Sequence, residues 1–177
     1  FRQGLGAVLG AKKVKGFVCR GGYPKSIADP NLLRVVADDY SSNRNSNPVM
    51  VSQDSGWNLA SWITQSEEGR AFPMPTRNFS SSTFEAVNDF TTQSLRRSFG
   101  PNPGSNLVGG EPERFVVRSG PFATDPRYGV LEMNGLNAVG PLTGTTDPAA
   151  VLKVLEICYR FGMDPESLGG TLAWAME

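Results

Sequence analysis

The chain has 177 residues, and its 17 Lys and Arg residues balance 17 Asp and Glu residues. A chain of this length buries roughly 70% of its unfolded surface on folding, so one or two domains with a real core are expected. The balanced charge gives no basic field for nucleic acid, and no apolar run approaches the roughly 20 residues of a membrane span, so we expect a soluble, cytoplasmic protein that binds neither nucleic acid nor membrane.

The first part of the chain predicts two helices and one strand. Residues 4–13 are glycine-led and apolar and end in two lysines, which favours a short helix. Residues 14–19 are rich in β-branched and aromatic side chains and predict a strand before Gly21 and Gly22. Asp29 and Pro30 supply an N-cap and a first helical residue, so residues 30–40 predict a helix with one apolar face. The Ser- and Asn-rich residues 41–48 then predict a loop.

The middle of the chain predicts two further helices separated by loops. Residues 57–67 are helical by pattern, whereas two prolines make residues 72–79 extended or turned. Ser82 and Glu85 form a capping-box pattern, which predicts a helix that runs to Phe99 and stops at Gly100. Residues 100–112 are dominated by Gly, Pro and Asn and predict a loop, and residues 114–119 form a weak strand pattern.

The last part of the chain predicts two consecutive helices, each begun by Asp-Pro. The first starts at Asp147, carries a wide apolar face and ends at Gly162, and the second restarts at Asp164. The whole pattern predicts a mainly α fold with a small β contribution, in the α+β class. The first residue is not Met and the last lies within a helical pattern, so both ends are expected to be cut.

The glycine-led turn near the start of the chain is a candidate ligand contact, although a turn of this kind is more often structural. Gly4-Leu5-Gly6 lets the backbone approach a ligand closely, and a helix start beyond it directs free N–H groups at an anion. Another turn, with Gly162 and Asp164, lies between the last two predicted helices. Each has an ordinary structural reading as well, because Gly162 suits a helix C-terminus and Asp164 suits an N-cap.

Four stretches of the chain match one family in the order that the family has them. Residues 1–15 read FRQGLGAVLGAKKVK, residues 75–79 read PTRNF, residues 155–164 read LEICYRFGMD, and residues 171–177 read TLAWAME. These stretches resemble the R-x-G-L-G-A-V-x-G-S-K-x-L-K, P-T-x-N-F/Y, E-L-C-N-R-Y-G-L-D and T-I-A-F-A-M-E motifs of the aldehyde ferredoxin oxidoreductases. The resemblance spans nearly the whole chain but only the middle of a full family member.

The resemblance implies a cofactor, a reaction and a domain division. Family members bind one tungsten between two pterin dithiolenes beside a 4Fe–4S cluster, and they oxidise aldehydes to carboxylic acids. Residues 1–22 would close an N-terminal pterin-binding domain, and residues 23–177 would be an incomplete, helix-rich second domain. Carried over residue by residue, the family's pterin contacts fall on these positions: Arg2, Gly4, Leu5, Gly6, Gly162, Met163 and Asp164.

The chain departs from the family pattern where the iron–sulfur cluster should be held. Residues 100–110 replace the C-x-x-C-x-x-x-C run and contain no cysteine, so no 4Fe–4S cluster is expected from this chain. The family's G-P-E-Y-E-T motif would fall on residues 130–135, where Glu132 keeps one glutamate and Asn134 replaces the other. Glu132 is therefore the candidate catalytic carboxylate, although a solvent-facing or ion-paired role is also open to it. The chain has no histidine.

Three interpretations follow, and they belong to different functional classes. In the first, the chain is part of a tungsten or molybdenum bis-pterin enzyme that shares its cofactor with the remaining polypeptide or other subunits and acts on an aldehyde. In the second, it is a non-catalytic structural or assembly subunit derived from that family. In the third, it is a helix-rich domain that binds a partner through Trp57, Trp62 and Trp174. We prefer the first, which requires the two glycine-bearing turns to meet and present main-chain donors to one ligand.

Overall fold

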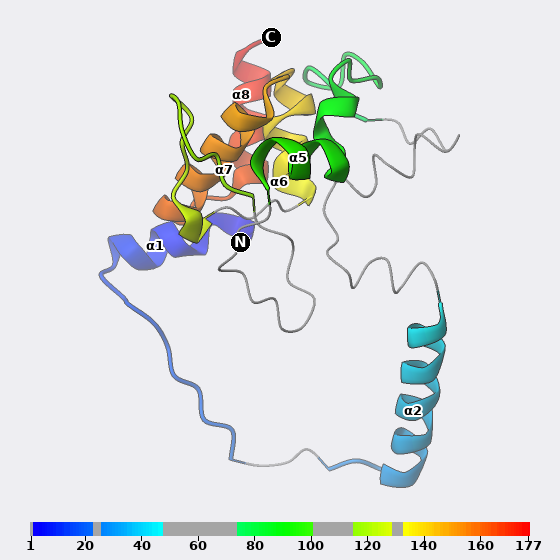
Figure 1. The fold of residues 1–177 in the computed structure, drawn as a ribbon. Helices are drawn as coiled ribbons and strands as arrows, with labels where there is room; N and C mark the ends of the chain where they lie inside the picture. The colour runs from blue at the N-terminus through cyan, green and yellow to red at the C-terminus, as the bar shows by residue number, and fades with distance from the viewer. Residues whose placement is uncertain (1, 23–25, 48–73, 101–114, 129–132) are drawn as a thin grey trace.

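The computed structural model describes residues 2–22, 26–47, 74–100, 115–128 and 133–177, and these are mainly helical (Figure 1). This confirms the predicted helix-rich fold. None of the described helices is long and apolar enough to cross a membrane. In chain order the helices are η1 (Arg2–Gly4), α1 (Leu5–Ala11), α2 (Pro30–Ser46), η2 (Val87–Phe90), α5 (Thr92–Phe99), η3 (Pro126–Tyr128), α6 (Met133–Val139), η4 (Pro141–Thr143), α7 (Pro148–Phe161) and α8 (Pro165–Ala175).

Helix α7 lies at the centre of the hydrophobic core. Asp147 caps its N-terminus by accepting a hydrogen bond from the Ala149 N–H at 2.8 Å, and Pro148 takes the first helical position. Its apolar face is buried against residues from α5, α6, η2 and the segment that begins at Phe115. The fully or almost fully buried members of this core are Phe90, Leu95, Phe115, Leu136, Val151, Leu152 and Leu155.

Helices α6 and α8 pack closely because a glycine lies at their contact. A Cβ atom built on Gly169 of α8 would overlap the main chain of Ala138 of α6. The neighbouring Gly170 has nothing within 4 Å of its Cβ position. Helix α6 was not predicted from the sequence, since Asn134, Gly135 and Asn137 are poor helix formers.

The predicted strands are the main correction to the secondary structure. Residues 14–19 form no strand, and their one main-chain hydrogen bond to a described residue is from the Val14 N–H back to the Leu9 carbonyl; the described part of residues 114–119 forms no strand either. The β-bridge that joins described residues is an isolated one between Thr76 and Ser81. A strand needs a neighbouring strand for its main-chain groups, and the described part of the chain offers none to residues 14–19.

Two predicted helix boundaries are also wrong. Helix α2 continues to Ser46, through residues expected to be a loop. The capping box at Ser82 and Glu85 does not start a helix, because Glu85 forms an ion pair with Arg77 instead. The helix begins at Thr92 after Thr91, whose hydroxyl accepts from the Ser94 N–H at 3.1 Å, and it ends before Gly100 as predicted. The helix predicted at residues 57–67 lies outside the described residues.

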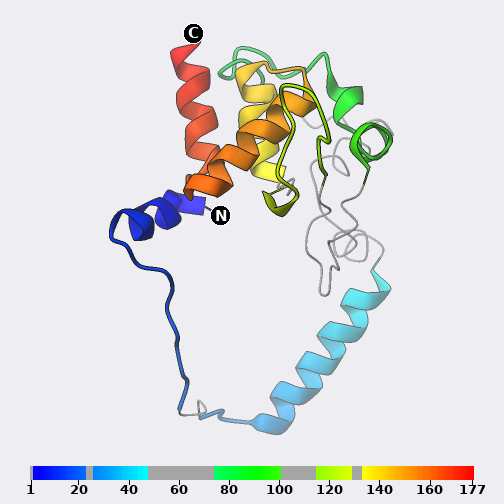
Figure 2. The same ribbon diagram turned by 60° about the vertical axis from the view of Figure 1, so that its left-hand side comes forward.

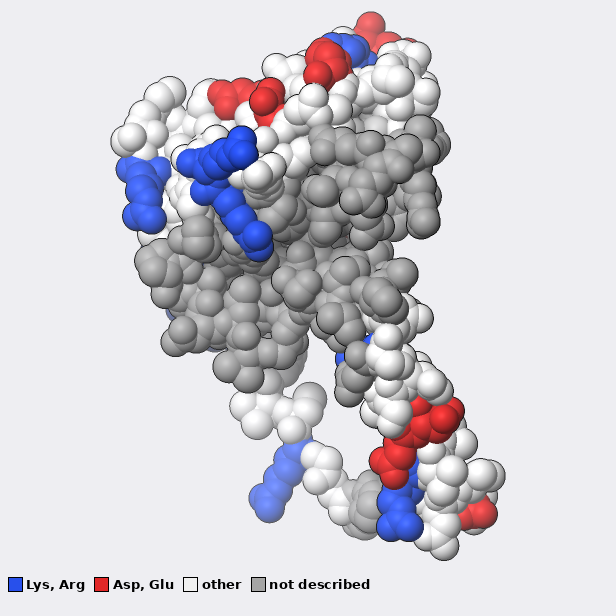
Figure 3. All heavy atoms as spheres, turned by 45° about the vertical axis from the view of Figure 1, so that its right-hand side comes forward, with Lys and Arg blue, Asp and Glu red and all other residues white. Residues whose placement is uncertain are grey.

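Helix α2 stands apart from the other described helices in both ribbon views (Figures 1 and 2). Asp29 caps it by accepting from the Asn31 and Leu32 N–H groups at 3.0 and 2.9 Å. Every side chain of α2 that the structure describes is exposed. The local sequence therefore accounts for the start of the helix. No described residue packs against its apolar face, and in the space-filling view too it lies away from the other described helices (Figure 3).

Candidate functional site

The turn between α7 and α8 is built by Gly162. This residue adopts a left-handed conformation, with φ 66° and ψ 25°. Its N–H donates to the Tyr159 carbonyl at 3.3 Å, and the Met163 N–H donates to the Cys158 carbonyl at 2.8 Å. These two bonds form a Schellman motif, which is the common way for a glycine to end a helix. The structural reading of Gly162 is thus confirmed.

The same glycine also contacts the other turn, far away in sequence. The Ala7 N–H donates to the Gly162 carbonyl at 3.0 Å. A Cβ atom on Gly162 would lie 2.5 Å from the Gly6 carbonyl carbon and 2.6 Å from the Ala7 nitrogen, so no larger residue fits. A Cβ on Gly6 would in turn lie 3.0 Å from the Gly162 Cα. We call this contact between Gly6, Ala7 and Gly162 the glycine clasp.

Asp164 joins the two turns a second time. Its carboxylate caps α8 by accepting from the Glu166 N–H at 3.0 Å, and it accepts from the Ser167 hydroxyl at 2.7 Å. The Ser167 hydroxyl is the main cause of the lowered pKa of this carboxyl, and the Gln3 main-chain N–H also contributes. Gln3 reaches this position with a φ of 73°, which is uncommon for a residue with a side chain.

The clasp limits where a ligand could lie. Gly6 and Gly162 touch main chain to main chain, so no ring fits between them. A ligand would have to lie on the outer surface near the start of α1, where Gly4 gives no side-chain cap and Leu5 is 58% exposed. Met163 and Asp164 are half-buried on the facing turn. This surface carries an exposed apolar side chain at Leu5 and a carboxylate at Asp164.

Two of the predicted site residues are not placed by the structure. Arg2 has its main chain in η1, but its side chain lies outside what the structure describes. Glu132 lies outside the described residues. Among the described residues no group of His, Cys, Asp and Glu side chains could hold a metal ion. Cys158 is buried, and burial raises the pKa of its thiol.

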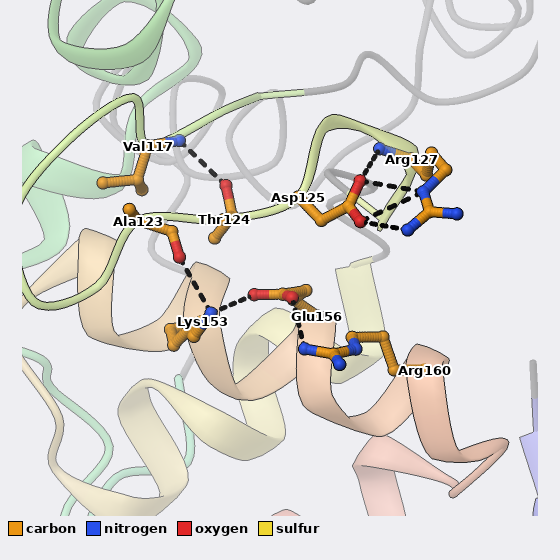
Figure 4. A network of polar contacts seen from close by, with 8 residues as sticks. All are labelled: Val117, Ala123, Thr124, Asp125, Arg127, Lys153, Glu156 and Arg160. Carbon is orange, nitrogen blue, oxygen red and sulfur yellow. Dashed lines mark hydrogen bonds and ion pairs between the residues drawn. The ribbon is translucent and has the colours of Figure 1, made fainter.

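A buried carboxylate on α7 was missed from the sequence (Figure 4). The side chain of Glu156 is 1% exposed and lies between Lys153 at 2.5 Å and Arg160 at 3.3 Å. The Lys153 ammonium also donates to the Ala123 carbonyl at 2.8 Å, which attaches the segment before η3 to α7. The signal was the spacing of opposite charges three and four residues apart, which places them on one helix face.

The attached segment has its own ion pair beside this cluster. Asp125 and Arg127 lie 2.5 Å apart, and the Arg127 N–H also donates to the Asp125 carboxylate (Figure 4). The Arg127 side chain lowers the pKa of Asp125 to about 2. Upstream, the Thr124 hydroxyl accepts from the Val117 N–H at 3.0 Å. The segment is therefore held by polar contacts at several points.

A hollow lies near the C-terminal end of α8. It measures about 380 Å³ and is lined by Arg77, Asn78, Ser80, Leu142, Thr143, Gly144, Ala173, Met176 and Glu177. Arg77, Asn78 and Phe79 all have positive φ, which is strained for residues with side chains. The Arg77 and Asn78 N–H groups donate to Pro141 and Leu142 carbonyls, however, and the Asn78 amide donates to Glu177 at 2.5 Å. These contacts give the strained turn a structural role.

Comparison with known proteins gives this geometry a family context. The family described as "Aldehyde ferredoxin oxidoreductase, domains 2 & 3" matches residues 38–177. The chain is 28% identical to the tungsten-containing aldehyde ferredoxin oxidoreductase of Thermococcus kodakarensis and 27% identical to that of Pyrococcus abyssi. Each match covers 99% of this chain but 28% of the relative. No solved structure matches the chain. The chain belongs to the aldehyde ferredoxin oxidoreductase family.

Proposed function

We propose that this chain is one part of a tungsten or molybdenum bis-pterin oxidoreductase that converts aldehydes to carboxylic acids. The observation that carries the proposal is the glycine clasp, because it brings together the two sequence stretches that the resemblance assigns to the pterins. The relatives are named as tungsten-containing aldehyde ferredoxin oxidoreductases, and the metal and the aldehyde reaction in this proposal come from those names. The chain spans 28% of their length, so other polypeptide is needed to complete the enzyme.

In this proposal the chain binds and orients the cofactor. No side chain caps the start of α1, where Leu5 is exposed, and this suits a close approach of the phosphate region of a pterin to the main chain, whereas the Ala7 N–H is already donated to the Gly162 carbonyl. Leu5 and Met163 offer apolar contacts to the ring, and Asp164 offers an acceptor whose position α8 fixes. When bound, the metal and its pterin dithiolenes supply the two-electron oxidation of the aldehyde.

The remaining roles in this proposal rest on sequence. Glu132 is the proposed carboxylate that moves a proton near the substrate. Residues 100–110 contain no cysteine, so any iron–sulfur cluster would have to be held by other polypeptide. The electron acceptor therefore need not be the one that the relatives use.

A matched pair of substitutions tests the proposal. Asp164→Ala and Asp147→Ala each remove an Asp N-cap that precedes a proline, so each should cost about 1 kcal/mol of folding stability. Only Asp164 lies beside the glycine clasp. We expect Asp164→Ala to lower the bound pterin and tungsten several-fold in the assembled enzyme, and Asp147→Ala to leave both near the wild-type level.

Two outcomes of this experiment would contradict the proposal. If both variants lose the same stability and keep full cofactor, Asp164 is only a helix cap and the proposed pterin surface is wrong. If the wild-type assembly itself contains no pterin, the chain is instead the structural subunit that the second interpretation describes. Pterin and metal content are measured directly, so the test does not depend on knowing the aldehyde.

A further inference from the structure

The Ser167 hydroxyl makes a contact on α8 that the start of the helix does not require. It donates to one oxygen of the Asp164 carboxylate at 2.7 Å, while the Glu166 N–H donates to the other oxygen at 3.0 Å. The Glu166 bond alone is an ordinary N-cap, because an Asp before a helix normally accepts from the main chain of the first turn. The Ser167 bond is a second restraint, and with both oxygens held the carboxylate has one orientation.

The other two helices that begin with Asp-Pro show that a hydroxyl is not needed at this place. Asp29 caps α2 by accepting from main-chain N–H groups, and Asp147 caps α7 in the same way. The residues that correspond to Ser167 in these two helices are Leu32 and Ala150, which have no hydroxyl. The additional bond at α8 is therefore not explained by helix initiation.

The Asp164 carboxylate lies between α8 and the start of the chain. The Ser167 hydroxyl is the largest cause of its lowered pKa, and the Gln3 main-chain N–H contributes as well, so donors from two distant stretches of sequence meet on one carboxylate. A Cβ atom built on Gly4 would lie 3.7 Å from the Asp164 nitrogen, so the main chains pack closely there. Gln3 has a φ of 73°, and a residue with a side chain keeps such a conformation only where its neighbours hold it. Asp164 is one such neighbour.

We propose that Ser167 is a positioning residue for the cofactor surface. Its hydroxyl orients the Asp164 carboxylate towards Gln3, and through Gln3 the carboxylate sets the conformation of the chain where α1 begins. Ser167 acts on that surface through Asp164 and makes no contact with the pterin itself. The inference rests on the proposed function, since it needs a pterin on this surface, and Ser167 is not among the residues that the family resemblance assigns to the pterins.

Removal and rescue of the hydroxyl test this role in the assembled enzyme. Ser167 is exposed, so Ser167→Ala should leave the fold intact. We expect this variant to retain at least about threefold less pterin and metal than the wild type, because hydrogen bonds to a carboxylate are among the stronger ones. Ser167→Thr restores a hydroxyl at the same place and should retain the wild-type content.

Thr171→Ala is the matched control for the loss of a hydroxyl. Thr171 lies one turn later on α8 and is also exposed. Its hydroxyl donates to the Ser167 carbonyl at 2.8 Å and not to Asp164. The Thr171→Ala variant should therefore keep the wild-type content of pterin and metal.

A double substitution tests whether Ser167 acts through Asp164. If it does, Asp164→Ala combined with Ser167→Ala should lose no more cofactor than Asp164→Ala alone, because the effects of residues in one hydrogen-bond network do not add. A double variant that loses the sum of the two single effects would overturn the inference.

The remaining outcomes separate this inference from the proposed function. Full cofactor in Ser167→Ala, or equal losses in Ser167→Ala and Ser167→Thr, would overturn the role of Ser167 and leave the proposed function standing. Thermal unfolding is measured on the same variants, and a cofactor loss that only follows a lowered midpoint would assign the hydroxyl to the fold and overturn the inference. A wild-type assembly without pterin would remove the proposed function and this role together.

Discussion

Gly162 performs three tasks that no other residue type could combine. It ends α7 in a left-handed conformation, it donates within the Schellman motif, and it lets the Gly6 main chain approach without a Cβ between them. The first two tasks were predictable, because helix ends favour glycine at this position. The third has no local sequence signal, because Gly6 and Gly162 lie far apart in the chain, and the meeting of the two turns was expected only from the family resemblance.

The ion pair of Asp125 and Arg127 predicts a pH dependence at the residue scale. The pKa of Asp125 is lowered to about 2 in the folded chain, whereas an unpaired Asp has a pKa of about 3.9. Because the folded state favours the carboxylate, the contribution to stability is present above about pH 4 and is lost as the pH falls towards 2. In the wild type, the urea concentration at which half of the protein is unfolded should fall as the pH is lowered over this range. In the Asp125→Asn variant this fall should be smaller.

The control for this prediction is Asp38→Asn on the exposed helix α2. The Asp38 side chain forms no ion pair with any described residue. Its replacement should therefore leave the pH dependence of the urea midpoint unchanged. An Asp125→Asn variant whose midpoint falls as steeply as that of the wild type would show that the pair with Arg127 is not formed in solution.

At the element scale, the contact between α6 and α8 depends on one of two adjacent glycines. Gly169→Ala would drive a methyl group into the main chain of Ala138, and overpacking of this kind destabilises a protein by at least ~2 kcal/mol. Gly170→Ala meets open space and should stabilise the helix by up to about 1 kcal/mol. Denaturant unfolding of the two variants measures both effects. Equal stability of the two would mean that the helices are farther apart than described.

The helices whose starts were predicted correctly are those with a capping aspartate and a proline at that start. Helices α2, α7 and α8 each begin at the proline of an Asp-Pro pair, as predicted, and α7 ends before a glycine. The capping box at Ser82 and Glu85 is not formed, and Glu85 instead pairs with Arg77, eight residues earlier in the chain. The strand predicted at residues 14–19 is not formed, because no described residue offers it a neighbouring strand.

At the scale of the whole molecule, the candidate site was predicted from family resemblance rather than from local pattern. Neither turn would identify a cofactor surface by its own geometry, because each is an ordinary helix end or cap. Their meeting in the glycine clasp is one of the two things that the preferred interpretation required; the other, that the turns present main-chain donors to one ligand, stays a prediction, because the Ala7 N–H is bonded to the Gly162 carbonyl. The clasp also restricts the proposal, since it places any pterin on the outer surface of the two turns and not between them.

The most direct test of the proposed cofactor role is the metal and pterin content of the protein purified from its native source. Elemental analysis and pterin release should find near-stoichiometric tungsten or molybdenum, together with pterin, in the assembly that contains this chain. Iron is expected only if another polypeptide supplies its ligands, because residues 100–110 hold no cysteine. An intact assembly that contains neither metal nor pterin would contradict the account.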